Sequence, residues 1–164
     1  MTPRTTVIPD VLDYLVNTFQ AASTLGAATP PVAVYDGPVT TAAPAQLVLW
    51  IGIQDPDGIA APIGAESQEQ WAGVGARQRN EYLTVHCVAE AWAGGTDVRT
   101  VRLAAYGIVA AVEIILQADP TLGGLVSFID NTMPQRQLRQ NNTADGQLAR
   151  VYFSIKAQAR IGGV

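Results

Sequence analysis

The sequence contains one histidine and one cysteine, and they are adjacent, at positions 86 and 87. A cysteine beside a histidine can act as a nucleophile and its base. Polar and apolar residues alternate along this segment, which is typical of a β-strand, so the side chains of His86 and Cys87 point to opposite faces. The pattern therefore excludes a Cys-His dyad and favours a half-exposed strand histidine. A single cysteine also excludes an intramolecular disulfide and a cysteine-ligated zinc site.

Two pairs of carboxylates have a spacing at which they could share a proton or hold Mg²⁺: Asp10 with Asp13, and Glu66 with Glu69. The first pair falls at the start of a predicted helix, where the helix dipole explains it. The second pair falls in a segment without periodicity. We therefore predict that neither pair is catalytic.

A glycine pair, Gly94–Gly95, precedes Thr96 between a predicted strand and a predicted helix, as in loops that bind phosphate. The Walker pattern requires a lysine before the threonine and four more residues between the glycines, and both are missing. A plain strand-to-helix turn is the better interpretation. The sequence thus predicts no catalytic residue, no metal ligand and no cofactor.

Arginines and one tryptophan are better suited to binding another protein. Arg77 lies near Arg79, and Arg136 and Arg139 form a second basic group with Arg150. Arginine pairs well with carboxylates across interfaces, although a solvated strand end explains these groups equally well. A tryptophan in a loop either marks an interface or folds back onto its own core. The predicted interface residues are Trp71, Arg77, Arg79, Arg136 and Arg139.

Composition limits the classes of function. A length of 164 residues fits one domain, and 48% hydrophobic with 15% charged residues excludes intrinsic disorder. A net charge of −4 argues against tight binding to bulk nucleic acid, which requires a basic surface. The N-terminus lacks the apolar region of a signal peptide. The longest apolar stretch, residues 108–116, contains Glu113 and is too short to span a bilayer, so we expect neither export nor membrane insertion.

The first half of the chain predicts one helix, two strands and a long loop. Pro9 and the apolar spacing that follows predict a helix over residues 9–23. Residues 32–35 predict a short strand, and residues 47–54 predict a central strand covered on both faces. Residues 55–76 are rich in glycine, alanine and proline, which predicts a loop long enough to reach a neighbouring subunit.

The second half predicts a long strand, an apolar helix and two closing strands. Alternation predicts a strand over residues 77–92, and Thr96 or Asp97 then caps a helix that runs to about residue 117. Strands over residues 125–138 and 147–161 follow, joined by a turn-rich connection at 141–146. The polar residues of the helix form one narrow stripe, which leaves apolar surface for a sheet and for a neighbouring subunit. That stripe comprises Arg99, Arg102, Tyr106, Glu113 and Gln117.

The predicted order is αβββαββ, an α+β fold with a mostly antiparallel or mixed sheet packed by two helices. This order resembles the tail terminator (tail completion) proteins of long-tailed, siphovirus-type bacteriophages. The resemblance rests on the N-terminal helix, the strand RQRNEYLTVHCVAEAW at 77–92, the glycine pair, the apolar helix and the closing strand GQLARVYFSIKAQARI at 146–161. It covers nearly the whole chain and depends on element order rather than on a signature motif.

The resemblance implies a single domain over residues 1–164 that forms a ring, expected to be a hexamer, on the end of the tail tube. Such a ring stops tube polymerisation and presents a surface to the head-closure connector. It implies no enzymatic activity, no cofactor and no membrane. The protein would assemble in the host cytoplasm and lie at the head–tail junction of the virion, with double-stranded DNA passing through an acidic or neutral lumen that repels phosphates.

Two alternatives remain open from the sequence. One is a neighbouring component of the same virion, such as a head-closure or minor tail protein. The other is a small hydrolase or ligand-binding domain that uses Glu66, Glu69, His86 or Asp97.

Overall fold

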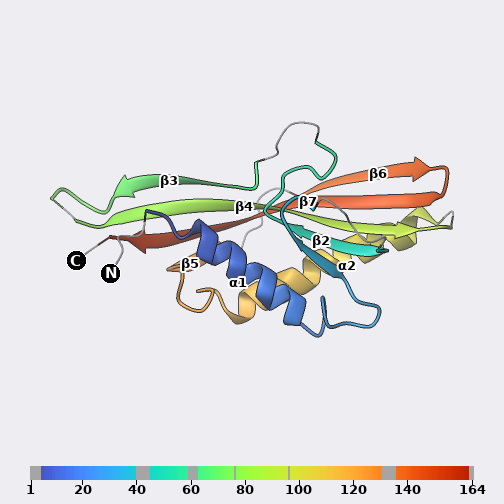
Figure 1. Ribbon diagram of the computed structural model, residues 1–164, viewed down its shortest axis with the longest axis horizontal. Helices are drawn as coiled ribbons and strands as arrows, with labels where there is room; N and C mark the ends of the chain where they lie inside the picture. Colours follow the sequence, from blue (N-terminus) through green and yellow to red (C-terminus); the bar gives the residue numbers. More distant parts are fainter. Residues whose placement is uncertain are drawn as a thin grey trace.

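The computed structural model describes residues 5–39, 45–58, 63–75, 77–95, 97–130 and 136–162. Within these residues the chain forms one mixed sheet of seven strands, with both helices on the same face (Figure 1). The helices are α1 (Ile8–Ala21) and α2 (Val98–Ala118). The strands are β1 (Ala33–Asp36), β2 (Leu47–Ile51), β3 (Ala65–Trp71), β4 (Arg79–Ala93), β5 (Phe128–Asp130), β6 (Gln137–Thr143) and β7 (Gly146–Ile161). The predicted α+β class is confirmed.

The sheet is built around β4 and β7, which pair antiparallel from Arg79 opposite Ile161 to Ala93 opposite Gln147. On the other side of β4, the shorter β3 and β2 follow each other along the strand, and β1 pairs parallel with β2. On the side of β7 away from β4, β5 and β6 pair with different parts of β7, one after the other. As a result β3 and β6 lie at opposite ends of an elongated sheet (Figure 1).

The predicted order αβββαββ is wrong, because two more strands are present. One of them, β3, lies inside the predicted loop at 55–76. Its sequence, AESQEQW, carries no alternation of polar and apolar residues because nearly all of the strand is exposed on both faces. The hydrophobic pattern therefore could not reveal it, and pairing with β4 is what makes it a strand.

The predicted strand at 125–138 is also wrong, since this stretch contributes to two strands, β5 and β6. Residues 131–135 between them lie outside the described residues. The predicted turn-rich connection at 141–146 is shorter than expected, because β6 continues to Thr143, which pairs with Gly146. The polar sequence of β6 is typical of a turn, but its backbone pairs with β7 along the edge of the sheet.

The end of β2 and the start of β3 meet at His86 of β4. The His86 carbonyl accepts hydrogen bonds from the N–H groups of Gly52 (2.9 Å) and Ile53 (3.1 Å), and its N–H donates to the Gly64 carbonyl (3.0 Å). A Cβ atom on Gly64 would lie 2.5 Å from the Gly52 carbonyl oxygen, so the close approach requires glycine here. β2 consequently ends at Ile51, three residues earlier than predicted.

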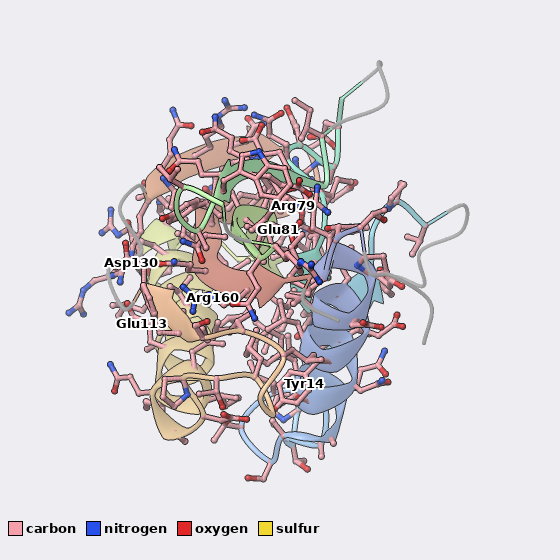
Figure 2. The ribbon with its side chains drawn as sticks, turned by 90° about the vertical axis from the view of Figure 1, so that its left-hand side faces the viewer. Tyr14, Arg79, Glu81, Glu113, Asp130 and Arg160 are labelled. Atoms are coloured by element: carbon pink, nitrogen blue, oxygen red, sulfur yellow. The ribbon has the colours of Figure 1, made fainter. Side chains whose placement is uncertain are left out.

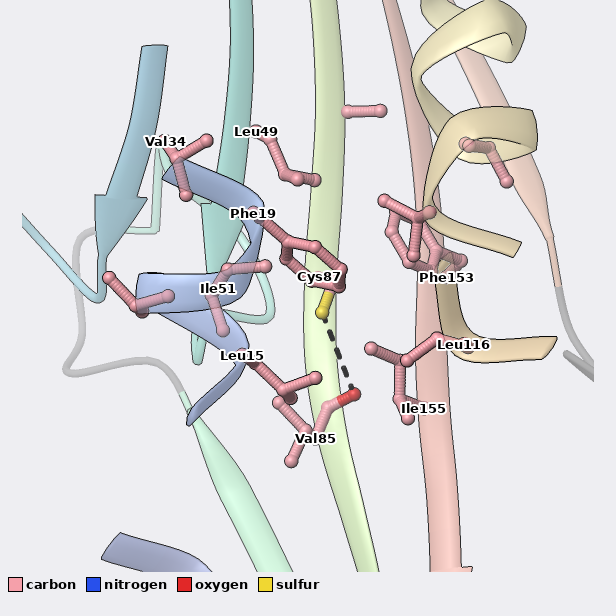
Figure 3. Close-up of a cluster of buried hydrophobic side chains, with 14 of the residues drawn as sticks. Leu15, Phe19, Val34, Leu49, Ile51, Val85, Cys87, Leu116, Phe153 and Ile155 are labelled. Carbon is pink, nitrogen blue, oxygen red and sulfur yellow. Dashed lines mark hydrogen bonds between the residues drawn. The ribbon is translucent and has the colours of Figure 1, made fainter. Parts of the chain in front are cut away.

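The hydrophobic core fills the space between the two helices and the sheet (Figure 3). α1 contributes Leu15 and Phe19, and alternate residues of β4 and β7 point toward them. Cys87 is one of these residues, and burial raises the pKa of its thiol to about 12. His86 lies on the opposite face, as the alternation predicted.

α2 is long and apolar enough to span a membrane by length and composition, a test that core helices of soluble proteins also pass. One stripe of the helix, which includes Val101, Ile108 and Val112, is buried. A second apolar stripe faces outward, with Leu103 56% and Ile114 66% exposed. The sheet therefore covers one side of α2 and leaves apolar side chains uncovered on another.

The N-terminus of α1 is capped by a residue from the sheet. The N-cap residue, Val7, has no side chain that can accept a hydrogen bond. Glu81 of β4, whose exposed fraction is 0%, instead accepts hydrogen bonds from the Val7 N–H (2.9 Å) and the Thr6 hydroxyl. The positive end of the helix dipole favours this carboxylate, so Glu81 attaches α1 to β4.

We predict that Glu81→Ala lowers the free energy of unfolding by about 1.5–3 kcal/mol, because it leaves the Val7 N–H without its charged acceptor. Urea denaturation measures this loss. Glu69→Ala is the matched control, since Glu69 pairs opposite Glu81 in the β3–β4 register and is exposed. The control should cost at most about 1 kcal/mol, the range of a surface ion pair. Equal losses in the two variants would contradict the capping role.

Candidate functional site

The five predicted interface residues lie in separate places. Trp71, Arg77 and Arg79 are together at the end of the hairpin formed by β3 and β4, which we call the β3–β4 tip (residues 71–79). Arg136 and Arg139 lie before and within β6, toward the other end of the sheet (Figure 1). The structure therefore supports two separate regions rather than one arginine patch.

The β3–β4 tip exposes apolar side chains. Trp71 is 68% exposed and Val74 is fully exposed. Arg79 forms an ion pair with Glu69, and its guanidinium carbon lies 6.0 Å from the centre of the Trp71 ring. Val74 was not predicted, although an apolar residue between Gly73 and Gly75 was the available signal. Exposed aromatic and aliphatic side chains on a protruding hairpin are typical of an interface.

The tip also carries an open strand edge. Within the described residues β3 pairs only with β4, so the backbone groups on its other side have no strand partner. Trp71 pairs opposite Arg79 and Ser67 opposite Leu83, so Trp71 points to the face that the helices cover elsewhere. The hairpin extends past the start of α1, so that its end projects beyond the helix (Figure 1).

Arg150 and Arg139 are engaged within the chain. Arg150, with a side chain 13% exposed, forms ion pairs with Glu90 (2.6 Å from Nε) and with Asp57. Burial by itself lowers the pKa of Arg150, but the hydrogen bond to Asp57 and the charge of Glu90 raise it above the ordinary value. Arg139 lies 3.8 Å from the Asp55 carboxylate and over the ring of Tyr152. These arginines hold residues 55–57 against β6 and β7.

Arg136 has a similar internal role, because it forms an ion pair with Glu113 of α2. The pair connects the segment before β6 to the exposed side of the helix. Of the predicted interface arginines, the two at the β3–β4 tip are therefore the ones that lie beside exposed apolar groups.

Of the four candidate hydrolase residues, the fold brings Glu66 and His86 together and keeps Glu69 and Asp97 apart from them. Glu66 lies 3.6 Å from the His86 imidazole, whereas Glu69 lies on the opposite face of β3 and pairs with Arg79. Asp97 caps α2, accepting a hydrogen bond from the Arg99 N–H (3.0 Å). Asp97 lies beyond the end of β4, whereas His86 lies in the middle of that strand, roughly 23 Å before its end at about 3.3 Å per residue.

Other sequence candidates also have structural roles. The alternative cap, Thr96, lies outside the described residues. Asp10 lies in the first turn of α1, as the dipole argument predicted. Among the residues that the structure describes, no group of three or more histidine, cysteine, aspartate or glutamate side chains could hold a metal ion.

A second feature suited to binding is an apolar groove between α1 and the C-terminal end of α2, which we call the α1–α2 groove. It encloses about 420 Å³. Leu15, Phe19, Leu116 and Leu122 are buried side chains along it, and the exposed Ile114 lies at its rim. The sequence did not reveal this groove, because its residues come from two helices and a turn more than ninety positions apart.

The Tyr14–Asp119 contact supports one end of the α1–α2 groove. The Tyr14 hydroxyl donates to the Asp119 carboxylate at 2.6 Å, which connects α1 to the end of α2. The Gly123 N–H donates to the same carboxylate at 2.7 Å, and Gly123 has a positive φ of 65°. Figure 2 views the molecule from the β3–β4 tip and shows Tyr14 at α1, separated in this view from Arg79 at the sheet.

These hydrogen bonds, with that of Tyr14 the strongest, lower the pKa of Asp119 from 3.8 to about 2. A carboxylate whose pKa is lower in the folded chain stabilises the fold above its ordinary pKa and loses that contribution as the pH falls. We predict that the stability difference between the wild type and Asp119→Asn is largest at neutral pH and shrinks between pH 4 and pH 2. Urea titrations across this range measure it. A difference that is constant with pH would contradict the assignment.

Substitution of Arg150 tests the ion pairs on the face of the sheet away from the helices. We predict that Arg150→Met lowers the free energy of unfolding by about 2–4 kcal/mol, because Glu90, only 15% exposed, loses its partner. The double variant Arg150→Met/Glu90→Met should regain most of this loss, since no unpaired charge remains. Denaturant unfolding of the three proteins measures the coupling. Additive losses would show that the two side chains act independently.

No protein-family model matches the sequence, and the search of curated proteins also found no match.

Proposed function

We propose that the protein is a structural subunit of a long-tailed bacteriophage, a tail terminator whose ring closes the end of the tail tube. The observation that carries this proposal is the β3–β4 tip, which exposes Trp71 and Val74 beside a strand edge that has no partner strand among the described residues. A protein that functions alone gains nothing from such a surface, whereas a subunit of an assembly buries it against its neighbours. Four of the elements on which the resemblance rested are present, namely the N-terminal helix α1, the long strand β4, the apolar helix α2 and the closing strand β7.

Several arginines have a structural role within the chain. Arg150, Arg136 and Arg79 each form an ion pair within the chain, which stabilises this fold. The net charge of −4 suits a ring through which double-stranded DNA passes, since an acidic lumen does not hold phosphates. The proposed partners are further copies of this chain in a hexameric ring, the tail tube protein and the head-closure protein.

The proposed location is the head–tail junction of the virion, after assembly in the host cytoplasm. A head-closure or minor tail protein of the same virion is the alternative, and it differs in its partner. A tail terminator binds the end of the tail tube, whereas a head-closure protein binds the connector in the absence of the tube.

We predict that adding the purified protein to polymerising tail tube protein yields shorter tubes, each with a ring at one end. Negative-stain electron microscopy measures both the length and the rings, and tube protein alone is the control. Trp71→Ser should reduce the fraction of capped tubes by about tenfold or more, as expected for a tryptophan at an interface. Tubes that grow unchanged and uncapped in the presence of the wild-type protein would overturn the proposal.

A further inference from the structure

Two apolar features of the chain are separate from each other. The β3–β4 tip protrudes from one end of the molecule (Figure 1), with Trp71 68% exposed and Val74 fully exposed. The α1–α2 groove is concave and lined mainly by apolar side chains. The tip lies at one end of the elongated sheet, and the groove lies between the two helices (Figures 1 and 2). The seven paired residues of β3 hold the tip in place, so it does not reach the groove of its own chain.

The charges at the two features have opposite signs. Arg77 is exposed at the tip, next to the Trp71–Arg79 pair. Asp119 lies along the groove and stays ionised at neutral pH. The tip is therefore basic and aromatic, whereas the groove is apolar and carries the Asp119 carboxylate.

We propose that the α1–α2 groove of one copy receives the β3–β4 tip of the next copy, with Trp71 and Val74 as the inserted side chains. This inference rests on the proposed function, because it names the contact by which the ring subunits join. The tip and the groove are different surfaces, so the contact is head-to-tail, and repeating it produces a ring when the rotation closes.

The contact is small, which explains how the subunit can remain separate before assembly. An aromatic side chain buries roughly 150–250 Å². A tip carrying one aromatic and one aliphatic side chain falls short of the roughly 1,200–2,000 Å² of a stable two-protein interface. In a closed ring every copy makes this contact twice, once with its tip and once with its groove. The dilute protein is therefore monomeric, and a tube end that gathers the copies promotes the ring.

Disulfide trapping tests this contact directly. The double variant Val74→Cys/Ser23→Cys places one thiol at the tip and one in the exposed part of the groove lining. Oxidation should yield a ladder of covalent oligomers on a denaturing gel, and the ladder should end at the ring size. The native Cys87 is buried and does not interfere.

Three controls make the result specific. Val74→Cys/Asn17→Cys places the second thiol on an exposed position of α1 outside the groove lining, and it should give at least tenfold less cross-linked product. A mixture of the two single variants, Val74→Cys and Ser23→Cys, should stop at dimers, because each chain then carries one thiol. Val74→Cys alone should stay monomeric, and dimers from it would overturn the proposal in favour of a tip-to-tip contact.

A variant that fills the groove provides a second readout without cysteines. Ala22→Trp places a ring in the groove, while Ala21→Trp places one at an exposed neighbouring position outside it. Ala22→Trp should reduce ring formation on tube ends by about tenfold or more, and Ala21→Trp should not. Circular dichroism melts of both variants identify any loss of folding.

The two proposals fail in different ways. A ladder from Val74→Cys/Ser23→Cys without capping of tubes would support the tip-in-groove contact and contradict the terminator function. Rings on tube ends without a ladder above the Asn17 control would support the terminator function and overturn the tip-in-groove contact.

Discussion

The antiparallel pairing of β4 with β7 is the interaction on which the rest of the structure depends. The fifteen residues of β4 pair with β7 throughout, and alternate side chains of both strands form the floor of the core. Because β4 and β7 stay paired beyond the helices, the middle of the sheet is covered by the helices and one end of the sheet is exposed. The shorter strands gain their positions from it, since each of β2, β3, β5 and β6 pairs with one of these two strands. The helices then pack on the apolar face that the pairing creates.

Polar contacts determine where the helices and loops attach to this frame. Glu81 caps α1 from inside the sheet, and Asp119 joins the end of α2 to Tyr14 of α1. Arg150 holds Asp57 and Glu90 on the other face. In each case one charged group satisfies two or more partners, which offsets the cost of removing it from water. The Tyr14–Asp119 hydrogen bond joins the two helices beside the α1–α2 groove, and the Arg150–Asp57 ion pair holds Asp57 against β7.

The proposed function follows from what this frame leaves uncovered. An apolar side chain exposed on a protruding hairpin is costly in an isolated protein and useful in an assembly, and the same holds for an apolar groove. In the proposed head-to-tail contact, the tip of one copy enters the groove of the next, so both apolar features are buried with copies of a single chain. In the proposed contact Arg77 of the tip and Asp119 of the groove carry opposite charges, which favours this orientation of the two copies.

The sequence by itself determined the elements whose side chains are periodic. The helices were predicted within two residues of their ends, and the alternation of β4 and β7 placed Cys87 in the core and His86 on the other face. These predictions hold because one side of each element is buried and the other is not, which leaves a pattern in the residue types. Residue type alone, without any periodicity, singled out Trp71 and the neighbouring arginines as candidates for an interface, and that role stays a prediction.

Only the tertiary structure decided the features that depend on backbone pairing or on contacts between distant residues. β3 and β6 are polar edge strands without a hydrophobic pattern, so only pairing with β4 and β7 identifies them. Glu81 acts on a helix more than seventy positions earlier, and the α1–α2 groove combines residues from both helices. Side-chain periodicity is a local property of the sequence, whereas capping by a distant carboxylate and the shape of a groove arise only when the folded chain brings those residues together.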